Sequence, residues 1–280
     1  MYKIVKKREL NPTVTLMEVD APFVARKAEP GQFIILRVDE EGERIPLTVA
    51  DFDREKGTVT IIFQIVGGTT ERLNHLNEGE YIQDFVGPLG EPSHTEGLKK
   101  VAVVGGGVGC AIAYPVAKKL HEQGAEVHSV VGFRNKDLVI LEEEFSAVSD
   151  VFKMMTDDGS YGEKGLVTDA LKALIEAGNS YDEVIAIGPV VMMKFVSLLT
   201  GQYGIKTVVS MNPIMIDGTG MCGCCRLTVA GKTRFACVDG PDFDGHEVDY
   251  DEILKRASTY KEFEAKEREK ACNLFKKEVR

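Results

Sequence analysis

Residues 101–123 read VAVVGGGVGCAIAYPVAKKLHEQ, and this stretch decides the fold of the second half of the chain. An apolar strand leads through a run of glycines into a segment with helical periodicity. Such a turn lets backbone N–H groups at a helix N-terminus approach a phosphate group. The spacing departs from the strict G-x-G-x-x-G pattern. By itself, the stretch is therefore a weak indication of a phosphate-binding turn.

The segments that follow alternate between strand and helix patterns. Strands are expected at VHSVVGF, VFKMMTD, EVIAIG and KTVVSM, which begin at residues 127, 151, 183 and 206. Helices are expected at LVTDALKALIEA (166–177) and MMKFVSLLT (192–200). This alternation predicts a parallel sheet with helices on both faces, which we assign to residues 98–210.

Residues 1–97 have a different pattern. Six short segments, rich in β-branched and aromatic residues, are separated by turn residues: KIVKKREL, TVTLMEV, QFIILRV, RIPLTVA, TVTIIFQIV and EYIQDFV. They predict a six-stranded antiparallel barrel, and only TERLNHL (70–76) has a helical pattern here. Residues 211–280 complete the chain with a loop-rich segment that holds most of the cysteines and a charged, helical tail from residue 249.

Composition limits the classes of function. The chain has 280 residues and a net charge of −10, which argues against a nucleic-acid surface. No stretch approaches the roughly 18 uninterrupted apolar residues of a membrane helix. The N-terminal sequence MYKIVKKREL lacks the apolar segment of a signal peptide. We therefore expect a cytoplasmic protein that binds neither nucleic acid nor membrane.

Four of the six cysteines lie close together, at positions 222, 224, 225 and 237. In a reducing compartment such a group indicates a metal or iron–sulfur site rather than disulfides. The run DGTGMCGCC (217–225) with Cys237 follows the C-x4-C-x2-C…C spacing of plant-type [2Fe–2S] sites, with Asp217 in the first position. A carboxylate can ligate iron as an oxygen donor. We predict four iron ligands, with Cys224 as a bystander: Asp217, Cys222, Cys225 and Cys237.

A zinc site made by the four clustered cysteines is the alternative. Adjacent Cys224 and Cys225 make poor partners in a zinc knuckle, and the usual second C-x2-C pair is missing. The spacing favours iron–sulfur over zinc.

A third group of residues lies in the barrel half. Arg44-Ile-Pro-Leu-Thr48 places an arginine and a hydroxyl on one strand, and Gly67-Gly-Thr-Thr70 forms a turn that leads into the short helix. Both features suit a pyrophosphate. Taken alone, Arg44 is more often a solvated surface charge.

In this order the motifs resemble the ferredoxin–NADP reductase superfamily over nearly the whole chain. The resemblance also includes GPLG (87–90), TDDGSYGEKG (156–165) and the IGP turn (187–189). Within the superfamily, the cysteine loop resembles the electron-transfer subunits of dihydroorotate dehydrogenases. The run MNPIMIDGTGMCGCCR (211–226) is more similar to the small subunits of NADH-dependent reduced ferredoxin:NADP oxidoreductases, because the dihydroorotate relatives carry cysteine where Asp217 stands.

The resemblance implies two sets of cofactor-binding residues. For FAD these are Arg44, Pro46, Leu47, Thr48, Ile62, Phe63, Gln64, Gly68, Thr69 and Thr70. For the nicotinamide nucleotide they are Gly105, Gly106, Gly107, Val108, Gly109, Asp157, Asp158, Gly188 and Pro189. No side chain is implied as an acid–base catalyst, because hydride chemistry belongs to the flavin. Ile187 departs from the family, in which many members have cysteine there, and leaves the placement of the nicotinamide ring open.

The implied function is electron transfer between a partner subunit and NAD(H) through a [2Fe–2S] cluster and FAD. The implied partner is a large subunit with FAD and two [4Fe–4S] clusters, in an electron-bifurcating heterodimer that also handles ferredoxin and NADP(H). One alternative is the electron-transfer subunit of a dihydroorotate dehydrogenase, and another is a non-catalytic zinc-binding interaction module.

Two details stay open at this point. The resemblance favours NAD, whereas Arg134 and Lys136 either bind the 2′-phosphate of NADP or are plain surface charges. The tail, residues 249–280, either packs on its own domain or docks on the large subunit.

Overall fold

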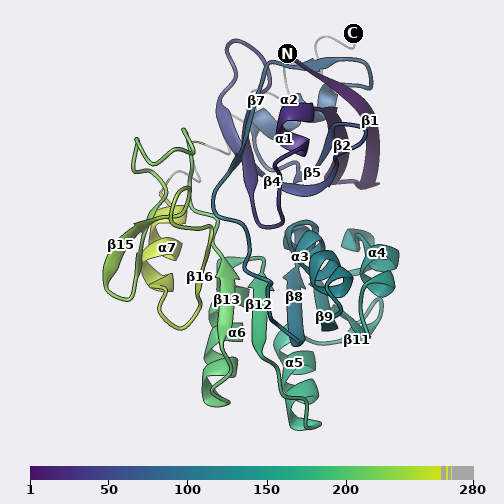
Figure 1. The fold of residues 1–280 in the computed structure, drawn as a ribbon, viewed down its shortest axis with the longest axis vertical. Coiled ribbons are helices and arrows are strands. Elements are labelled where there is room, and N and C mark those ends of the chain that lie inside the picture. The colour runs from purple at the N-terminus through teal and green to yellow at the C-terminus, as the bar shows by residue number, and fades with distance from the viewer. Residues whose placement is uncertain (260–262, 264–265, 267–280) are drawn as a thin grey trace.

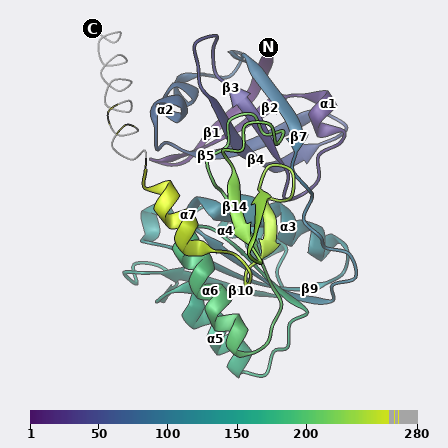
Figure 2. The same ribbon diagram turned by 90° about the vertical axis from the view of Figure 1, so that its left-hand side faces the viewer.

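The computed structural model describes residues 1–259, 263 and 266. A barrel formed by the N-terminal part lies above an α/β unit, and a small C-terminal segment lies beside both (Figure 1). Figure 2 shows the same arrangement from the side on which this segment faces the viewer.

The barrel contains all six predicted strands, with the last one divided in two. The strands are β1 (Tyr2–Asn11), β2 (Val14–Asp20), β3 (Phe33–Arg37), β4 (Arg44–Asp53), β5 (Thr58–Gln64), β6 (Tyr81–Ile82) and β7 (Asp84–Leu89). Their order is β6-β1-β2-β5-β4-β3-β7, and every pair is antiparallel. Because β6 and β7 follow one another in the chain but lie at opposite edges, the sheet of seven strands nearly closes on itself.

The barrel core follows from the alternation of side chains along its strands. Met17, Ile34, Ile61, Phe63 and Phe85 are buried in one apolar cluster inside the barrel. Two short helices accompany the strands, α1 (Pro22–Ala25) and α2 (Gly68–His75), and the second confirms the helix predicted at 70–76.

The second unit is the predicted parallel sheet. Its strands are β8 (Lys100–Gly106), β9 (Glu126–Phe133), β10 (Val151–Thr156), β11 (Glu163–Lys164), β12 (Glu183–Ile187) and β13 (Thr207–Ser210), in the order β11-β10-β9-β8-β12-β13. The helical elements are η1 (Gly107–Gly109), α3 (Cys110–Glu122), η2 (Lys136–Leu138), α4 (Glu142–Ala147), α5 (Val167–Glu176) and α6 (Val190–Gln202). α3 and α4 pack on one face and α5 and α6 on the other, as the alternation predicted.

The C-terminal segment has more regular structure than its loop-rich sequence indicated. A hairpin of β14 (Arg226–Val229) and β15 (Lys232–Phe235) turns at Ala230 and Gly231, whose φ angles are 51° and 69°. Two positive φ values are typical of the type I′ hairpin turn. Strand β16 (Asp242–Asp244) joins the edge of the second sheet antiparallel to β13, and helix α7 (Tyr250–Ala257) follows.

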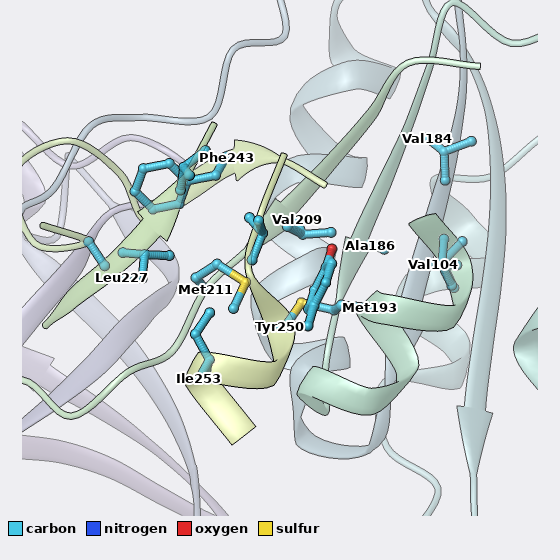
Figure 3. Packing of buried hydrophobic residues seen from close by; sticks show 14 of the residues in the cluster. Val104, Val184, Ala186, Met193, Val209, Met211, Leu227, Phe243, Tyr250 and Ile253 are labelled. Atoms are coloured by element: carbon cyan, nitrogen blue, oxygen red, sulfur yellow. The ribbon is translucent and has the colours of Figure 1, made fainter. Parts of the chain in front are cut away.

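One apolar cluster joins all three parts of the molecule. It contains Phe33 and Ile35 from the barrel, Val104 and Met193 from the α/β unit, and Cys225 from the C-terminal segment. Figure 3 shows the region of this cluster where α6, β13 and α7 meet, with Met193, Tyr250 and Ile253 packed together. Full burial of such a side chain contributes about 1.5–3 kcal/mol to folding.

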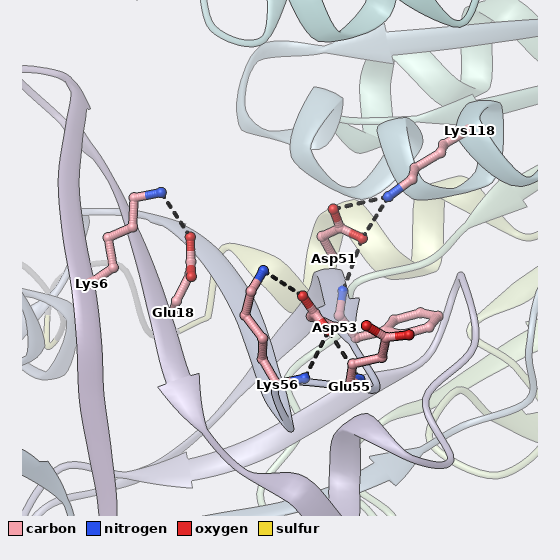
Figure 4. A network of polar contacts seen from close by, with 8 residues as sticks. Lys6, Glu18, Asp51, Asp53, Glu55, Lys56 and Lys118 are labelled. Atoms are coloured by element: carbon pink, nitrogen blue, oxygen red, sulfur yellow. Dashed lines mark hydrogen bonds and ion pairs between the residues drawn. The ribbon is translucent and has the colours of Figure 1, made fainter.

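A second contact connects the barrel to the α/β unit. Leu16, Ala50 and Ile62 on the outside of the barrel share a cluster with residues of α3. At its margin the Lys118 ammonium on α3 lies 3.0 Å from Asp51 Oδ1 on β4, and Figure 4 shows this pair between the two parts. The barrel and the α/β unit are therefore held by apolar packing and by partly exposed ion pairs, which also include Arg8 with Glu144 and Lys119 with Glu29.

Within the described residues, no helix is long and apolar enough to cross a membrane. The first part of the tail packs on its own domain, because Tyr250 and Ile253 of α7 are buried. Leu254 is half-buried, and Ala257 and Phe263 are exposed, whereas the apolar positions at 260, 272, 274 and 275 lie outside the described residues.

A buried carboxyl at the junction of the parts predicts how stability depends on pH. Ser93 Oγ donates to Asp242 Oδ2 at 2.5 Å, and Asp242 Oδ1 is buried with no hydrogen-bond partner in the described chain. Burial raises the pKa of Asp242. An acid with a raised pKa in the folded state contributes stability that is present at low pH and is lost as pH rises through that pKa.

We therefore expect Asp242→Asn, which stays neutral, to gain stability relative to the wild type as pH rises. The gain should be on the order of 1–3 kcal/mol, the usual penalty of a buried unsatisfied polar group. Urea unfolding across the acidic-to-neutral range measures it. Asp20→Asn removes an exposed carboxyl and should leave the pH profile parallel to the wild type. Parallel profiles for both variants would contradict the assignment.

Candidate functional site

Two glycine turns meet at the carboxyl edge of the parallel sheet. The GGGVG turn (105–109) ends β8, the Gly188-Pro189 turn follows β12, and these two strands are neighbours. The chain leaves β8 toward β9 on one side, whereas β12 lies on the other side, so this is the point at which the strand order reverses. In open α/β sheets, ligands bind in the crevice at such a point.

The glycines are required because the two turns touch through their backbones. A Cβ added to Gly109 would lie 2.6 Å from both Gly188 Cα and Ile187 O, and one added to Gly106 would lie 2.4 Å from Met192 Sδ. Gly107 adopts a φ of 54°, which favours glycine. The turn then leads through η1 into α3, whose N-terminus presents backbone N–H groups suited to a phosphate.

The two predicted aspartates lie farther along the same edge. Asp157 and Asp158 follow β10, which is separated from β8 by β9, and both are exposed. Asp158 Oδ1 accepts a hydrogen bond of 2.9 Å from the Ser160 backbone N–H. Hydrogen bonds from Ser160 lower the pKa of Asp158, so the carboxylate form is favoured.

The neighbouring basic residues differ in their surroundings. The Lys136 ammonium lies 5.5 Å from the centre of the Tyr161 ring, and its backbone N–H donates to Ser160 Oγ at 2.8 Å. Arg134 is exposed and makes no ion pair within the part of the chain that is described. These contacts join the loops after β9 and β10.

The predicted flavin residues gather on β4, β5 and the start of α2. Arg44 is exposed at the beginning of β4, and Pro46, Leu47 and Thr48 follow it, paired with β3. Thr69 Oγ1 donates to Glu43 Oε2 at 3.2 Å, so the N-terminus of α2 lies beside the start of β4. The structure therefore brings together the arginine and the helix N-terminus that the sequence singled out.

The other predicted flavin residues differ in their burial and in their hydrogen bonds. Thr70 Oγ1 accepts the backbone N–H groups of Val66 and Gly67 at 3.0 Å and caps α2. Phe63 is 1% exposed and points into the barrel, so it can offer only backbone groups to a ligand. Ile62 faces α3 in the second cluster, and Gln64 is half-buried at the end of β5.

The predicted iron ligands form two pairs. The Asp217 carboxylate accepts the backbone N–H groups of Thr219 at 3.0 Å and Cys222 at 2.9 Å, so this loop folds round its own carboxylate. Cys225 and Cys237 lie at the open end of the β14–β15 hairpin, with their sulfurs 3.2 Å apart. The Ala236 N–H donates to Cys225 O at 3.2 Å and extends the hairpin to these cysteines.

The two pairs differ in environment. Cys222 is exposed, and the Cys224 backbone N–H is the main cause that lowers its thiol pKa. Cys225 and Cys237 are each 2% exposed, and burial raises the pKa of Cys237 to about 12. A bound metal would override this difference, because a coordinated thiol is deprotonated outright.

This donor set fits a two-iron cluster better than a single zinc ion. Within the described residues, no three His, Cys, Asp or Glu side chains are gathered as a ligand set for one metal ion. A [2Fe–2S] cluster has two irons and therefore takes its ligands as two pairs. The predicted ligands lie as the pairs Asp217 with Cys222 and Cys225 with Cys237, and the Cys224 thiol is hydrogen-bonded to that of Cys222.

The loop that carries Asp217 packs directly on the barrel. A Cβ added to Gly218 would lie 2.8 Å from Ile35 Cγ1 and from Leu89 Cδ1. Ile35 pairs across the sheet with Pro46, one of the predicted flavin residues. The cysteine loop and the flavin strand are thus separated by one strand of the barrel.

Sequence reasoning predicted a helical tail from residue 249 but missed that its first helix, α7, supports this loop. Arg256 on α7 donates to the backbone carbonyls of Cys224 and Arg226, and Glu252 Oε2 accepts the Thr228 N–H at 3.0 Å. The only signal in the sequence was an arginine in the last turn of a helical pattern near the cysteines.

Comparisons with known proteins agree with this geometry. Residues 212–249 match the family model for the iron–sulfur cluster binding domain of dihydroorotate dehydrogenase B. The chain is 49% identical over 264 residues to a dihydroorotate dehydrogenase B (NAD(+)) electron transfer subunit homolog of Thermotoga maritima, covering 94% of this chain and 93% of that protein. It is 33% identical over 242 residues to the dihydroorotate dehydrogenase B (NAD(+)) electron transfer subunit of Fusobacterium nucleatum, covering 83% and 92%.

A solved structure is also similar over nearly its whole length. It is a chain of an NADH-dependent reduced ferredoxin-NADP oxidoreductase, whose structure gives insights into flavin-based electron bifurcation. The TM-score is 0.91 at 48% identity, covering 96% of this chain and 97% of that one.

Because the two glycine turns touch, a methyl group added at their contact should destabilise the protein, whereas one added at an open glycine should not. Gly109→Ala places a Cβ against backbone atoms and should lower the free energy of unfolding by about 1–3 kcal/mol, the cost of overpacking, and weaken nucleotide binding. Thermal unfolding and titration with a nicotinamide nucleotide measure both effects.

Gly201→Ala in α6 is the matched control. Its Cβ would meet His246 only at 3.5 Å, and alanine in a helix interior is favoured over glycine by about 0.5–1 kcal/mol. Equal stability and nucleotide affinity in the two variants would contradict the close approach of the turns.

Proposed function

The chain belongs to the family of dihydroorotate dehydrogenase B electron transfer subunits and their homologues, and we propose that it serves as the NAD(H)-linked subunit of an electron-bifurcating oxidoreductase. It is an electron-transfer flavoprotein and iron–sulfur subunit with FAD, a [2Fe–2S] cluster and NAD(H). The observation that carries the proposal is the place of the cysteine loop, because Gly218 packs on the barrel strand next to the predicted flavin strand.

The proposed assignment of residues follows from the geometry. Arg44 and the N-terminus of α2 would hold the FAD pyrophosphate, while β4 and β5 would line the flavin. The glycine turns after β8 and β12, with Asp157 and Asp158, would frame the nicotinamide nucleotide. Asp217, Cys222, Cys225 and Cys237 would ligate the cluster. These roles correspond to a division of the chain at 1–97, 98–210 and 211–280.

The protein's contribution to the chemistry is positioning. FAD and the cluster, when bound, supply hydride transfer with NAD(H) and single-electron transfer respectively. The apolar cluster round Phe33, Ile35 and Cys225 keeps water from the space between the barrel and the cysteine pair. Arg44 would neutralise phosphate charge, and the packed glycine turns would fix the nucleotide over the barrel edge.

A larger partner subunit is implied by the relatives, which are named as electron transfer subunits. We propose that it docks over the cysteine loop, where Cys222 is exposed and Ile216, Met221 and Val238 present apolar surface; Met221 is 89% exposed. We further propose that this partner carries FAD and [4Fe–4S] clusters, forms a heterodimer with this chain, and uses ferredoxin and NADP(H). The free thiols suit the reducing cytoplasm.

The second candidate is the electron-transfer subunit of a dihydroorotate dehydrogenase. The family model over residues 212–249 favours it. Asp217 in place of a cysteine favours bifurcation, as does the 48% identity to the oxidoreductase chain. The Fusobacterium protein, which is named as the subunit itself, is 33% identical, and the Thermotoga protein at 49% is named only as its homolog.

One purification separates the possibilities. The native complex should contain a large flavin and [4Fe–4S] subunit without orotate activity, and the isolated chain should contain flavin, iron and sulfide and be reduced by NADH in preference to NADPH. An FMN-binding partner with orotate activity would establish the second candidate. A colourless chain that contains zinc would overturn both.

Asp217 is predicted to bind iron. Asp217→Cys should retain a cluster with a changed EPR spectrum and potential, because thiolate and carboxylate differ as donors. Asp217→Ala should lower iron content, whereas Cys224→Ser should change neither iron nor spectrum. An unchanged EPR spectrum and potential in Asp217→Ala rules the ligand out. Loss of the cluster in Cys224→Ser but not in Cys222→Ser would show that the register is wrong.

Arg44 is predicted to bind FAD. Arg44→Ala should purify with less than one FAD per chain and an intact cluster, with FAD affinity lowered about tenfold or more, the value of a hydrogen bond to a charged group. Flavin absorbance and FAD titration of the apoprotein measure this. Arg54→Ala, which removes a barrel arginine paired with Glu29 at 2.7 Å, is the control and should keep full FAD. Full occupancy in Arg44→Ala counts against the role.

A further inference from the structure

Helix α7 contacts the cysteine hairpin through one arginine fork. Arg256 Nη1 donates to Arg226 O at 2.5 Å, and Nη2 donates to Cys224 O at 2.9 Å. The two carbonyls belong to the residues on either side of Cys225. A planar guanidinium can bridge two acceptors in this way, and an ammonium cannot do so with the same geometry.

The fork completes the hydrogen bonding of the turn that carries Cys225. The carbonyl of Cys225 itself accepts the Ala236 N–H at 3.2 Å, and the Arg226 N–H donates to Gly223 O at 3.4 Å. Three successive carbonyls, from residue 224 to residue 226, are therefore each held by a donor. The Cys225 side chain is fixed between two restrained peptide groups and points toward Cys237.

The helix that presents Arg256 is itself anchored to the hairpin. Asp249 caps α7 by accepting the Glu252 N–H at 3.0 Å, and Glu252 Oε2 accepts the Thr228 N–H on β14 at 3.0 Å. Glu252 Oε1 lies 3.9 Å from Arg256 Nη1. Tyr250 and Ile253 bury the other face of α7 in the core that joins the three parts. The guanidinium is thus held by a fixed helix and not by a mobile surface segment.

We propose that Arg256 is a positioning residue for the iron–sulfur site: its fork holds the Cys224–Arg226 turn in the geometry that ligates iron, and its charge stabilises the reduced cluster. The inference rests on the proposed cluster at Asp217, Cys222, Cys225 and Cys237. Partners that orient metal ligands typically change metal affinity about 10–100-fold when removed. Charge and hydrogen bonds near a cluster are among the factors that set its potential.

Two substitutions separate the fork from the charge. Arg256→Lys keeps the positive charge but cannot bridge both carbonyls, whereas Arg256→Gln loses the charge as well. Lys255→Gln is the matched control, because it removes a positive charge from the same last turn of α7, and the Lys255 side chain is exposed and makes no ion pair in the described chain. All variants are compared as the FAD-loaded chain after cluster reconstitution.

The readouts are iron release to a chelator, the EPR spectrum and the cluster midpoint potential. Both Arg256 variants should release iron about tenfold faster than the wild type. The potential should become more negative in Arg256→Gln and stay closer to the wild type in Arg256→Lys. Lys255→Gln should match the wild type in all three measurements.

Several outcomes would overturn the proposal. Wild-type iron release in Arg256→Lys would show that the fork is not needed. A potential in Arg256→Gln equal to that of Lys255→Gln would remove the role of the charge. Loss of FAD and a lowered Tm in both Arg256 variants would show a general folding role. A wild-type chain that takes up no [2Fe–2S] cluster would instead refute the proposed function, so the two failures are distinguishable.

Discussion

The close packing of Gly218 on Ile35 and Leu89 is the contact on which the arrangement of the molecule depends. A side chain at Gly218 would push the cysteine loop away from the barrel, and its φ of 74° also favours glycine. Around this contact, one apolar cluster takes Phe33 from the barrel, Val104 from the sheet and Cys237 from the hairpin. The three parts cannot separate without exposing that cluster to water, which is how a chain of several units keeps its proposed redox groups close together.

The same packing explains why the site is divided between exposed and buried halves. Cys222 and Asp217 lie on a loop stabilised by hydrogen bonds to its own backbone, while Cys225 and Cys237 are enclosed by the hairpin and the core. Burial favours the neutral form of the Cys237 thiol, so iron binding there must overcome desolvation. In the other pair Cys222 is exposed and Asp217 is half-buried, so a partner protein can approach it from the solvent. Such an asymmetry suits a group that receives electrons from outside and passes them inward.

Much of the fold could be predicted from the sequence because local patterns of apolar and turn residues determine it. Apolar strands alternating with helices, as in VAVVGGGVG and the helix after it, predicted the parallel sheet and the turn at its edge, and β-branched runs predicted the barrel. The β14–β15 hairpin was not predicted, since its strands are four residues each and carry charges at Lys232 and Arg234. The supporting contacts of Arg256 and the burial of Phe63 arise from tertiary packing, which no local pattern records.

Charged side chains are placed differently at the edges of the molecule and at the junction of its parts. Arg44, Arg134 and Cys222 are exposed at the edges of the barrel, the sheet and the loop, where ligands or partners approach. Toward the junction, Lys118 is paired with Asp51, and Asp242 accepts from Ser93 while burial raises its pKa and so favours its neutral form. Unpaired charge at the junction would cost several kcal/mol per ion even after relaxation. Exposed charge at the rim and close apolar packing at the centre suit the proposed binding of cofactors and a partner at the edges of the molecule.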